Sequence, residues 1–430
     1  MQFIWMSDQP RTTLLFLAAS LSLMLMFAGS SAMAAEKKMI AGVEHIQNPN
    51  TPTDGSIDIH LKELWRAGGS DGDLIFGMIT QIRNDVNGNI FVMDAQLSQV
   101  HVFSPQGDLL RTLFAEGEGP GEIRGPRDLV LMNDGRIGAV QEMPGKLIFV
   151  DKQGDPAGSL SIGGTKAGHG NMCQTFSAFT NGDQLLIAGF VQAPGSEGGH
   201  MNQINFLSSF DESGQSLVEF IIEENDLDMA DFVFDEMHNL APFWWNAAIN
   251  TAGDVYVAPY LNRYQIQVFA PDGSLKNVIE RDYKPWSRSK ADKDYFENMV
   301  RAIYHGVPFE IRVKVSDYEP VIQYLHRGLR IHPDGTLWVL TTHGIRQPAN
   351  GAMATFDVFS TEGVFTRQVN VHAGWNSMSD TIFFLDENHA LVVTGFADAM
   401  LTQFTSGNMT LDLDDEEGSV EIFYCEMEWE

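Results

Sequence analysis

The stretch AEGEGPGEIRGPRDL, residues 115–129, contains four glycines within nine residues and could be a phosphate-binding loop. Such a loop turns backbone N–H groups towards the phosphate and is usually followed by a Lys, a Ser or Thr, and a helix. Here three glutamates would repel phosphate, and the next residues, DLVLMNDG (128–135), predict a short strand and a tight turn. The stretch is therefore predicted to connect two strands.

A turn followed by an apolar strand recurs six times along the chain, as in NGNIFVMD and PDGTLWVLTT. A second apolar strand, such as QVHVFSP or QIQVFAP, follows each copy, and five of these are followed by a further Gly turn and another strand. Together with the strand before each turn, every unit has four strands in an up-and-down order. A four-stranded unit that repeats every few tens of residues predicts the blades of a β-propeller. The six copies begin at Asn87, Asn133, Asn181, Ala252, Pro333 and Asp386.

The sixth unit is one strand short, because the chain ends soon after SVEIFYC. An open edge in a propeller invites aggregation, so the missing strand is predicted to come from the other end of the chain. Residues 57–66, IDIHLKELWR, fit this role and should pair with residues 419–427. The predicted fold class is all-β: a six-bladed β-propeller of four-stranded antiparallel blades, its ring closed by an N-terminal strand that completes the last blade. Residues 115–129 then connect blade 1 to blade 2, where glycines allow the chain to return to the inner wall.

The expected organisation has three parts. Residues 1–35 resemble a signal peptide: Arg11 precedes an apolar run, and Ala32-Met33-Ala34 fits a cleavage site after Ala34. An uncleaved anchor helix is the alternative, although the run is short for a membrane span. Residues 36–56 are expected to be a linker, and residues 57–430 a single propeller with a helical insertion near 281–325. The protein is expected to be periplasmic or secreted.

Composition narrows the possible partners. The formal net charge of −30 argues against nucleic acid and against anionic membrane surfaces. We therefore expect no nucleic acid partner, no membrane contact beyond the signal segment, and a monomer. Cys173 and Cys425 fall in blades on different sides of the predicted ring, so no disulfide is expected. The twelve histidines form no ligand cluster in the sequence, and neither a cofactor nor a metal is expected.

The motif GEGPGEIRGPRDL, with the repeated DGxhhV and hhVFxxxG units, resembles the six-bladed β-propeller superfamily of the NHL and TolB-like kind. In particular it is similar to the exported bacterial proteins of this fold, over roughly residues 57–430. The resemblance implies the propeller fold. The superfamily contains scaffolds, lactonase-like hydrolases and amidating lyases, so the resemblance does not decide the activity.

The connections between predicted strands are unequal. Tight turns form one face, whereas residues 189–202, 222–243, 281–325 and 396–418 are long connections on the opposite face. Long connections on a rigid scaffold tend to carry function. The longest is predicted to contain an amphipathic helix over the channel mouth, or one that only packs on the rim. The helix should be capped by Ser289, with an apolar face of Phe296, Met299, Val300 and Ile303, and with basic residues Lys284, Arg288, Lys290, Lys293 and Arg301.

Candidate ligand-binding residues follow from the repeat. The position eight residues before each turn Gly, or before Asn388 in the last blade, should lie at the start of an inner strand. Arginines there would bind a carboxylate or phosphate with a forked geometry, and tryptophans would offer a stacking surface. With the preceding position included, the candidates are Arg127, Gln174, Trp244, Trp245, His326, Arg327 and Asp380.

Two functions remain open at this point. The first is an exported, non-catalytic propeller that binds a small anionic ligand, or an envelope protein or peptide, at the face with the long connections. The alternative is a metal-dependent enzyme of lactonase or lyase type with its site in the central channel. A further possibility is that the arginines pair with Asp128 or Asp380 and only join neighbouring blades.

Overall fold

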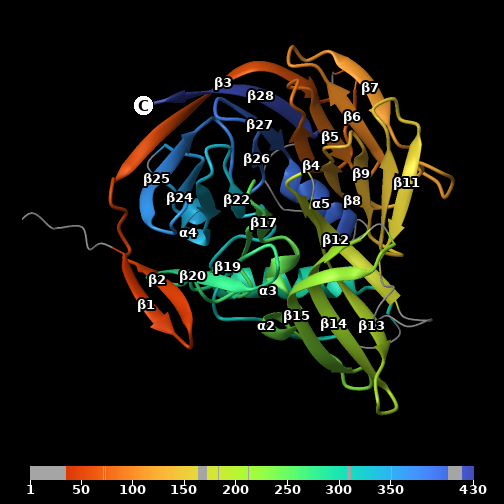
Figure 1. Cartoon of the computed structure of the whole chain (residues 1–430), viewed down its shortest axis with the longest axis vertical. Helices are drawn as coiled ribbons and strands as arrows, with labels where there is room; N and C mark the ends of the chain where they lie inside the picture. Colours follow the sequence, from red (N-terminus) through yellow and green to blue (C-terminus); the bar gives the residue numbers. More distant parts are fainter. Residues whose placement is uncertain are drawn as a thin grey trace, which may run out of the picture. The chain divides into compact units, whose positions relative to one another are not determined.

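Four-stranded antiparallel sheets, here called blades, follow one another along the chain (Figure 1). The computed structural model describes residues 35–70, 72, 74–162, 172–182, 184–211, 213–307, 311–349, 351–404 and 419–430. Most of the predicted signal peptide, residues 1–34, lies outside the described residues. No helix in the described part of the chain is both long and apolar enough to cross a membrane.

The first three blades are formed by consecutive strands. Blade 1 contains β4 (Ile79–Asn84), β5 (Ile90–Asp94), β6 (Gln99–Phe103) and β7 (Leu109–Leu113). Blade 2 contains β8 (Pro126–Leu131), β9 (Ile137–Gln141), β10 (Lys146–Val150) and β11 (Pro156–Ser161). Blade 3 contains β12 (Met172–Thr180), β13 (Leu185–Pro194), β14 (His200–Phe210) and β15 (Ser216–Asp228).

The other three blades follow the same pattern, and the last takes one strand from the other end of the chain. Blade 4 contains β17 (Ala247–Ile249), β18 (Val255–Val257), β19 (Gln265–Phe269) and β20 (Leu275–Arg281). Blade 5 contains β22 (Leu329–Ile331), β23 (Leu337–Leu340), β24 (Ala354–Phe359) and β25 (Phe365–His372). Blade 6 contains β26 (Thr381–Phe384), β27 (His389–Thr394), β28 (Glu421–Trp429) and β3 (Ser56–Gly68).

The hydrophobic core consists of layers between successive blades. Strands such as β5, β9 and β24 are buried along their whole length because both of their faces are covered. One apolar layer lies between each pair of successive blades, and a sixth joins blade 6 to blade 1 through residues such as Leu391, Tyr424, Ile82 and Phe103. Figure 1 shows the first strand of each blade nearest the middle of this arrangement.

The predicted pairing of the N-terminal strand is confirmed. β3 pairs with β28 in the antiparallel direction, with Trp65 opposite Tyr424 and Glu63 opposite Cys425. The first residues of β3 also pair in parallel with β25, from Ser56 to His60, which the sequence did not indicate. One strand therefore connects blades 5 and 6. Both cysteines are buried and free, as predicted.

Residues 36–56, expected to be a linker, contain a hairpin of β1 (Glu36–Ile40) and β2 (Val43–Asn48). β2 pairs in parallel with β20 and extends blade 4. The buried Asn48 accepts from Phe365 N at 2.8 Å and donates to Gly363 O at 2.9 Å, so it joins this hairpin to blade 5. The hairpin was missed because its strands are short and largely polar.

The two ends of the blades differ, as predicted. At one end the connections are short Gly turns, such as 85–89 and 332–336. The other end, which we call the long-connection face, carries the helices of the described residues: α2 (Glu236–Asn239), η1 (Pro242–Trp244), α3 (Lys290–Ile303), α4 (Thr342–Arg346) and α5 (Phe396–Phe404). Two predicted loops are partly wrong: most of 189–202 belongs to β13 and β14, which leave a connection of 195–199, and 222–228 belongs to the end of β15.

The predicted helix of the long insertion is present as α3, with Ser289 at its N-cap in a capping box with Asp292. Phe296 and Val300 are buried against Phe232, Phe234 and Ile311, so this helix packs on the preceding connection. Two short strands, β16 (Val233–Asp235) and β21 (Arg312–Lys314), pair in parallel beside it. The last helical residue, Ile303, was expected to be on the apolar face but is 43% exposed.

Four of the five basic residues predicted for this insertion, Arg288, Lys290, Lys293 and Arg301, are paired with carboxylates. Arg288 donates to both carboxylate oxygens of the buried Glu236, which fixes α2 beside the start of α3. The remaining pairs are on the surface. They join Lys290 to Asp294, Lys293 to Asp317, and Arg301 to Glu297.

Candidate functional site

A fully buried carboxylate connects four of the six blades at their first strands. Asp128 lies on β8 and is 0% exposed. It accepts hydrogen bonds from Gln81 Nε2 of blade 1 and from Ala178 N of blade 3, each at 2.9 Å. Arg327, which precedes β22 of blade 5, places its Nη2 3.0 Å from Asp128 Oδ2. The ion pair therefore extends between blades 2 and 5, which are three positions apart in the blade order.

Arg327 has an unusual backbone conformation for this role. Its φ is +48°, in the left-handed region that non-glycine residues seldom adopt and that costs on the order of 1–3 kcal/mol. The Arg327 N–H donates to Tyr324 O at 3.1 Å and closes a tight turn directly before β22. The turn and the pair with Asp128 hold the strained conformation. The sequence had left open that this arginine pairs with Asp128, and the structure contains that pair.

Two more arginines lie at the same centre. Arg330, on β22, donates to three backbone carbonyls: Arg327 O at 3.0 Å, His326 O at 2.7 Å, and Ile382 O of blade 6. Burial, and then the positive charges of Arg327 and Arg83, lower the pKa of Arg330 to about 9. Burial also lowers the pKa of Arg83, on β4, to about 10, opposed by the charge of Asp128. Three guanidinium groups therefore act on one another at this centre, and Asp128 is paired with one of them, Arg327.

The sequence contained a signal for Arg83 and Arg330 that the prediction did not use. Both lie five residues before the turn glycine of their blades, Gly88 and Gly335. They therefore occupy equivalent positions on the first strands of blades 1 and 5. These positions lie three residues further along the strand than the predicted ones. The prediction counted back eight residues to reach the beginning of each strand and so passed over them.

Two of the predicted residues meet on a carboxylate that was not predicted. Arg127 Nε and Gln174 Nε2 both donate to Glu142, which follows β9. The Glu142 side chain is 19% exposed and that of Arg127 is 16% exposed. The charge of Arg127 is therefore balanced within blades 2 and 3. Nothing in the repeat pattern marked Glu142, because it follows the second strand of its blade.

The predicted tryptophans lie together but differ in exposure. Trp244 is buried, and its ring centre is 4.6 Å from that of Phe176. Trp245 is half-buried and stacks on Tyr324, with 5.5 Å between ring centres and an angle of 27°. Of the two tryptophans, Trp245 is therefore the one whose ring keeps part of its surface exposed at the long-connection face.

The last two predicted residues have separate environments. His326 lies 6.0 Å from Phe396 between ring centres, and burial and the charge of Arg330 lower its pKa to about 4, so its ring is neutral near pH 7. Asp380 accepts from Asn376 N at 2.9 Å and Gly395 N at 3.0 Å. That carboxylate fixes the connection before β26, and it does not join the arginines.

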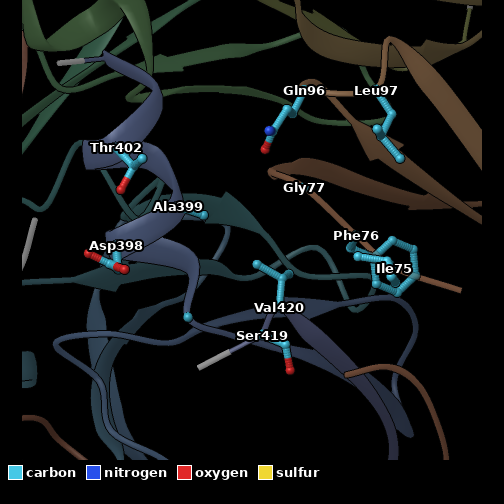
Figure 2. Close-up of a pocket in the computed structure, with 11 residues that line it drawn as sticks. Ile75, Phe76, Gly77, Gln96, Leu97, Asp398, Ala399, Thr402, Ser419 and Val420 are labelled. Atoms are coloured by element: carbon cyan, nitrogen blue, oxygen red, sulfur yellow. The ribbon is translucent and has the colours of Figure 1, made fainter. Parts of the chain in front are cut away.

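A pocket of about 590 Å³ opens on the long-connection face between α5 and blade 1 (Figure 2). Figure 2 shows Asp398 and Thr402 of α5 on one side, and Gln96 and Leu97 from the β5–β6 connection on the other. Asp398 of α5 also acts on α3: its charge contributes, after burial, to raising the pKa of Tyr295 to about 12.

The side chains at the centre of the blades are poorly suited to a metal cation. The described residues contain no group of three or more His, Cys, Asp or Glu that could hold a metal ion. The centre of the blades holds three arginines, whose positive charges disfavour a metal cation at that place.

Comparison with known proteins agrees with the fold. Residues 71–158 match a family model described as "6-bladed beta-propeller". No curated protein matches the sequence. The solved structures that the chain resembles include an exported protein from Bacteroides fragilis, with 11% identity and a TM-score of 0.46, covering 88% of this chain and 98% of that one. They also include a streptogramin B lyase, with 9% identity and a TM-score of 0.38, covering 79% of this chain and 82% of that one. A gluconolactonase from Xanthomonas campestris has 10% identity and a TM-score of 0.38, covering 87% of this chain and 96% of that one.

Proposed function

We propose that the protein is an exported, non-catalytic six-bladed β-propeller, with its ring closed by β3, that binds a ligand or protein partner at the long-connection face. The apolar layers between successive blades, including the one between blades 6 and 1, support a closed ring. The pairing of β3 with β28 supports the same arrangement. The blades then form a rigid scaffold, and the connections provide the binding surface.

The observation that carries this function is the distribution of exposed apolar side chains over the connections. In the described residues, Val86 is the exposed large apolar side chain within a short turn, and a few others lie on strands next to that end: Ile40, Leu109, Leu110, Leu217 and Trp429. The connections at the other end carry many more. Clustered exposed apolar side chains mark interaction surfaces, whereas scattered ones do not. They are Ile75, Leu97, Met143, Val233, Tyr295, Ile303, Tyr318, Leu325 and Met378.

The partner that suits this surface is an envelope protein or peptide with apolar side chains of its own. Met143, Met378 and Leu325 come from three different connections, so a partner can contact several blades at once. Methionine side chains adapt to irregular surfaces, which suits binding without a deep groove. The strongly negative net charge of −30 favours a partner that is basic around its apolar residues.

Photocrosslinking tests this proposal. A photoreactive amino acid at Leu325 should crosslink a defined partner in the envelope of the producing cell, because this side chain is exposed on the proposed surface. The same amino acid at Val86, on the short-turn end, is the matched control and should give no such product. The crosslink should weaken when Met143→Glu and Met378→Glu are introduced. Equal crosslinking from both ends, or no effect of the glutamates, would contradict the proposal.

A further inference from the structure

The centre of the blades has an excess of positive charge that the chain does not balance. Arg83, Arg327 and Arg330 act on one another electrostatically, and in the described residues the carboxylate that acts on this cluster is Asp128, which pairs with Arg327 and attracts Arg83. His326 is adjacent and neutral near pH 7 because its pKa is about 4. The cluster therefore carries two unmatched positive charges, in a chain whose net charge is −30. Uncompensated buried charge costs several kcal/mol per ion, so a resident anion would relieve it.

The arginines have hydrogen-bonding capacity left for such an anion. Among the described residues, the Arg83 side chain makes no hydrogen bond and no ion pair, whereas its backbone lies in the β4–β5 ladder. Arg330 uses three of its five N–H groups on the carbonyls of Arg327, His326 and Ile382, and two remain. Asp128 does not supply the missing acceptors, because its oxygens already accept from Gln81, Leu129, Ala178 and Arg327.

The cluster is not sealed from solvent. Arg83, Arg327 and Arg330 are half-buried, so each keeps some surface open to solvent. Burial is nevertheless the main cause that lowers the pKa of Arg83 and Arg330. Arg330 is also held in place: its guanidinium lies 5.7–6.0 Å from three phenylalanine ring centres. These rings belong to Phe356, Phe383 and Phe384.

We infer that the centre of the propeller is a binding site for a tetrahedral dianion, sulfate or phosphate or the equivalent group of a larger ligand, held by Arg83 and Arg330 and supported by Arg327. Two unmatched cations call for two negative charges. Arg83 and Arg330 come from blades 1 and 5, so their guanidinium groups approach the anion from different directions. The oxygens of a tetrahedral anion also point in different directions, so each arginine can bind one of them. A single planar carboxylate offers two oxygens in one plane. This site lies deeper than the surface proposed for a protein partner and does not depend on it.

Calorimetry on the full mature chain tests the site, with sodium sulfate and sodium phosphate as probes and sodium chloride keeping the ionic strength constant. We expect one sulfate per chain for the wild type. Arg83→Gln should weaken binding by about tenfold to a hundredfold, the usual effect of losing a charge-assisted hydrogen bond. Arg124→Gln is the matched control, because that arginine pairs with Glu118 on the surface. It should bind sulfate like the wild type.

Thermal unfolding gives a second readout that a merely structural arginine would not produce. Without sulfate, Arg83→Gln should melt at the same or a higher temperature than the wild type, because the variant loses an unmatched buried charge. Sulfate should raise the melting temperature of the wild type and not that of the variant. The inference is overturned if sulfate and chloride act alike on the wild type, if Arg83→Gln responds as the wild type does, or if succinate binds and sulfate does not. None of these outcomes depends on the crosslinking result.

Discussion

Replacing Asp128 with alanine should lower the free energy of unfolding by about 3–5 kcal/mol, the usual cost of removing one partner from a buried ion pair. The carboxylate is fully buried and is the counter-charge of Arg327. Its loss would also leave the hydrogen-bond donors of Gln81 and Ala178 without an acceptor. Urea unfolding followed by tryptophan fluorescence measures the change.

The matched control for this prediction is Glu118→Ala, which removes a carboxylate from a surface pair with Arg124. That change should cost less than about 1 kcal/mol, because exposed pairs are worth little. The double variant Asp128→Ala/Arg83→Gln should regain part of the lost stability, since one unmatched cation is removed as well. A loss below about 1 kcal/mol for Asp128→Ala would mean that the central arginines do not need this carboxylate.

Deleting residues 36–66 should cause aggregation. The deletion removes most of β3, which pairs with β28 on one side and β25 on the other, and leaves their backbone N–H and C=O groups unpaired at two sheet edges. Such edges are templates for intermolecular pairing. Light scattering and size-exclusion chromatography of the mature chain check the result.

Deletion of residues 36–40 provides the comparison. It removes β1, whose residues are all exposed and which pairs with β2 alone, so the shortened protein should remain monodisperse. If the longer deletion also gives a monodisperse protein with an unchanged melting temperature, β3 is not needed to complete the last blade.

The blade architecture could be predicted because it repeats. Strands such as β5, β9 and β24 are buried on both faces, and most short turns contain a residue such as Gly88 or Gly335 with a positive φ, so the same pattern recurs in the sequence. The sequence also showed that the last unit lacks one strand and that residues 57–66 can supply it. The hairpin at 36–48 was not visible in the sequence, because short polar strands stabilised by the buried Asn48 leave no periodic pattern.

The candidate site was harder to predict, since the sequence shows which residues begin a strand but not which partners they find. Arg127 was placed correctly at the start of an inner strand, yet Glu142 from the next connection balances its charge. Arg327 reaches Asp128 because a strained turn directs it towards the centre. Contacts between blades far apart in sequence depend on the assembled fold, and local patterns do not contain them.

The pairing of the N-terminal strand with the last blade is the basis of the proposed ring and of its charged centre, and a disulfide tests it most directly. Glu63 lies opposite Cys425 in the register of β3 and β28, and directly opposed residues of antiparallel strands have Cα atoms about 4.5–5.5 Å apart, within disulfide range. Leu64 lies at the bulge, has no partner in the register and is 47% exposed.

On mild oxidation, Glu63→Cys should form a disulfide with Cys425, and a non-reducing peptide digest analysed by mass spectrometry should contain the linked pair in nearly all of the monomeric protein. Leu64→Cys should remain a free thiol under the same conditions. A free thiol at position 63 in the folded monomer, or equal linkage from positions 63 and 64, would contradict the closure of the ring by β3.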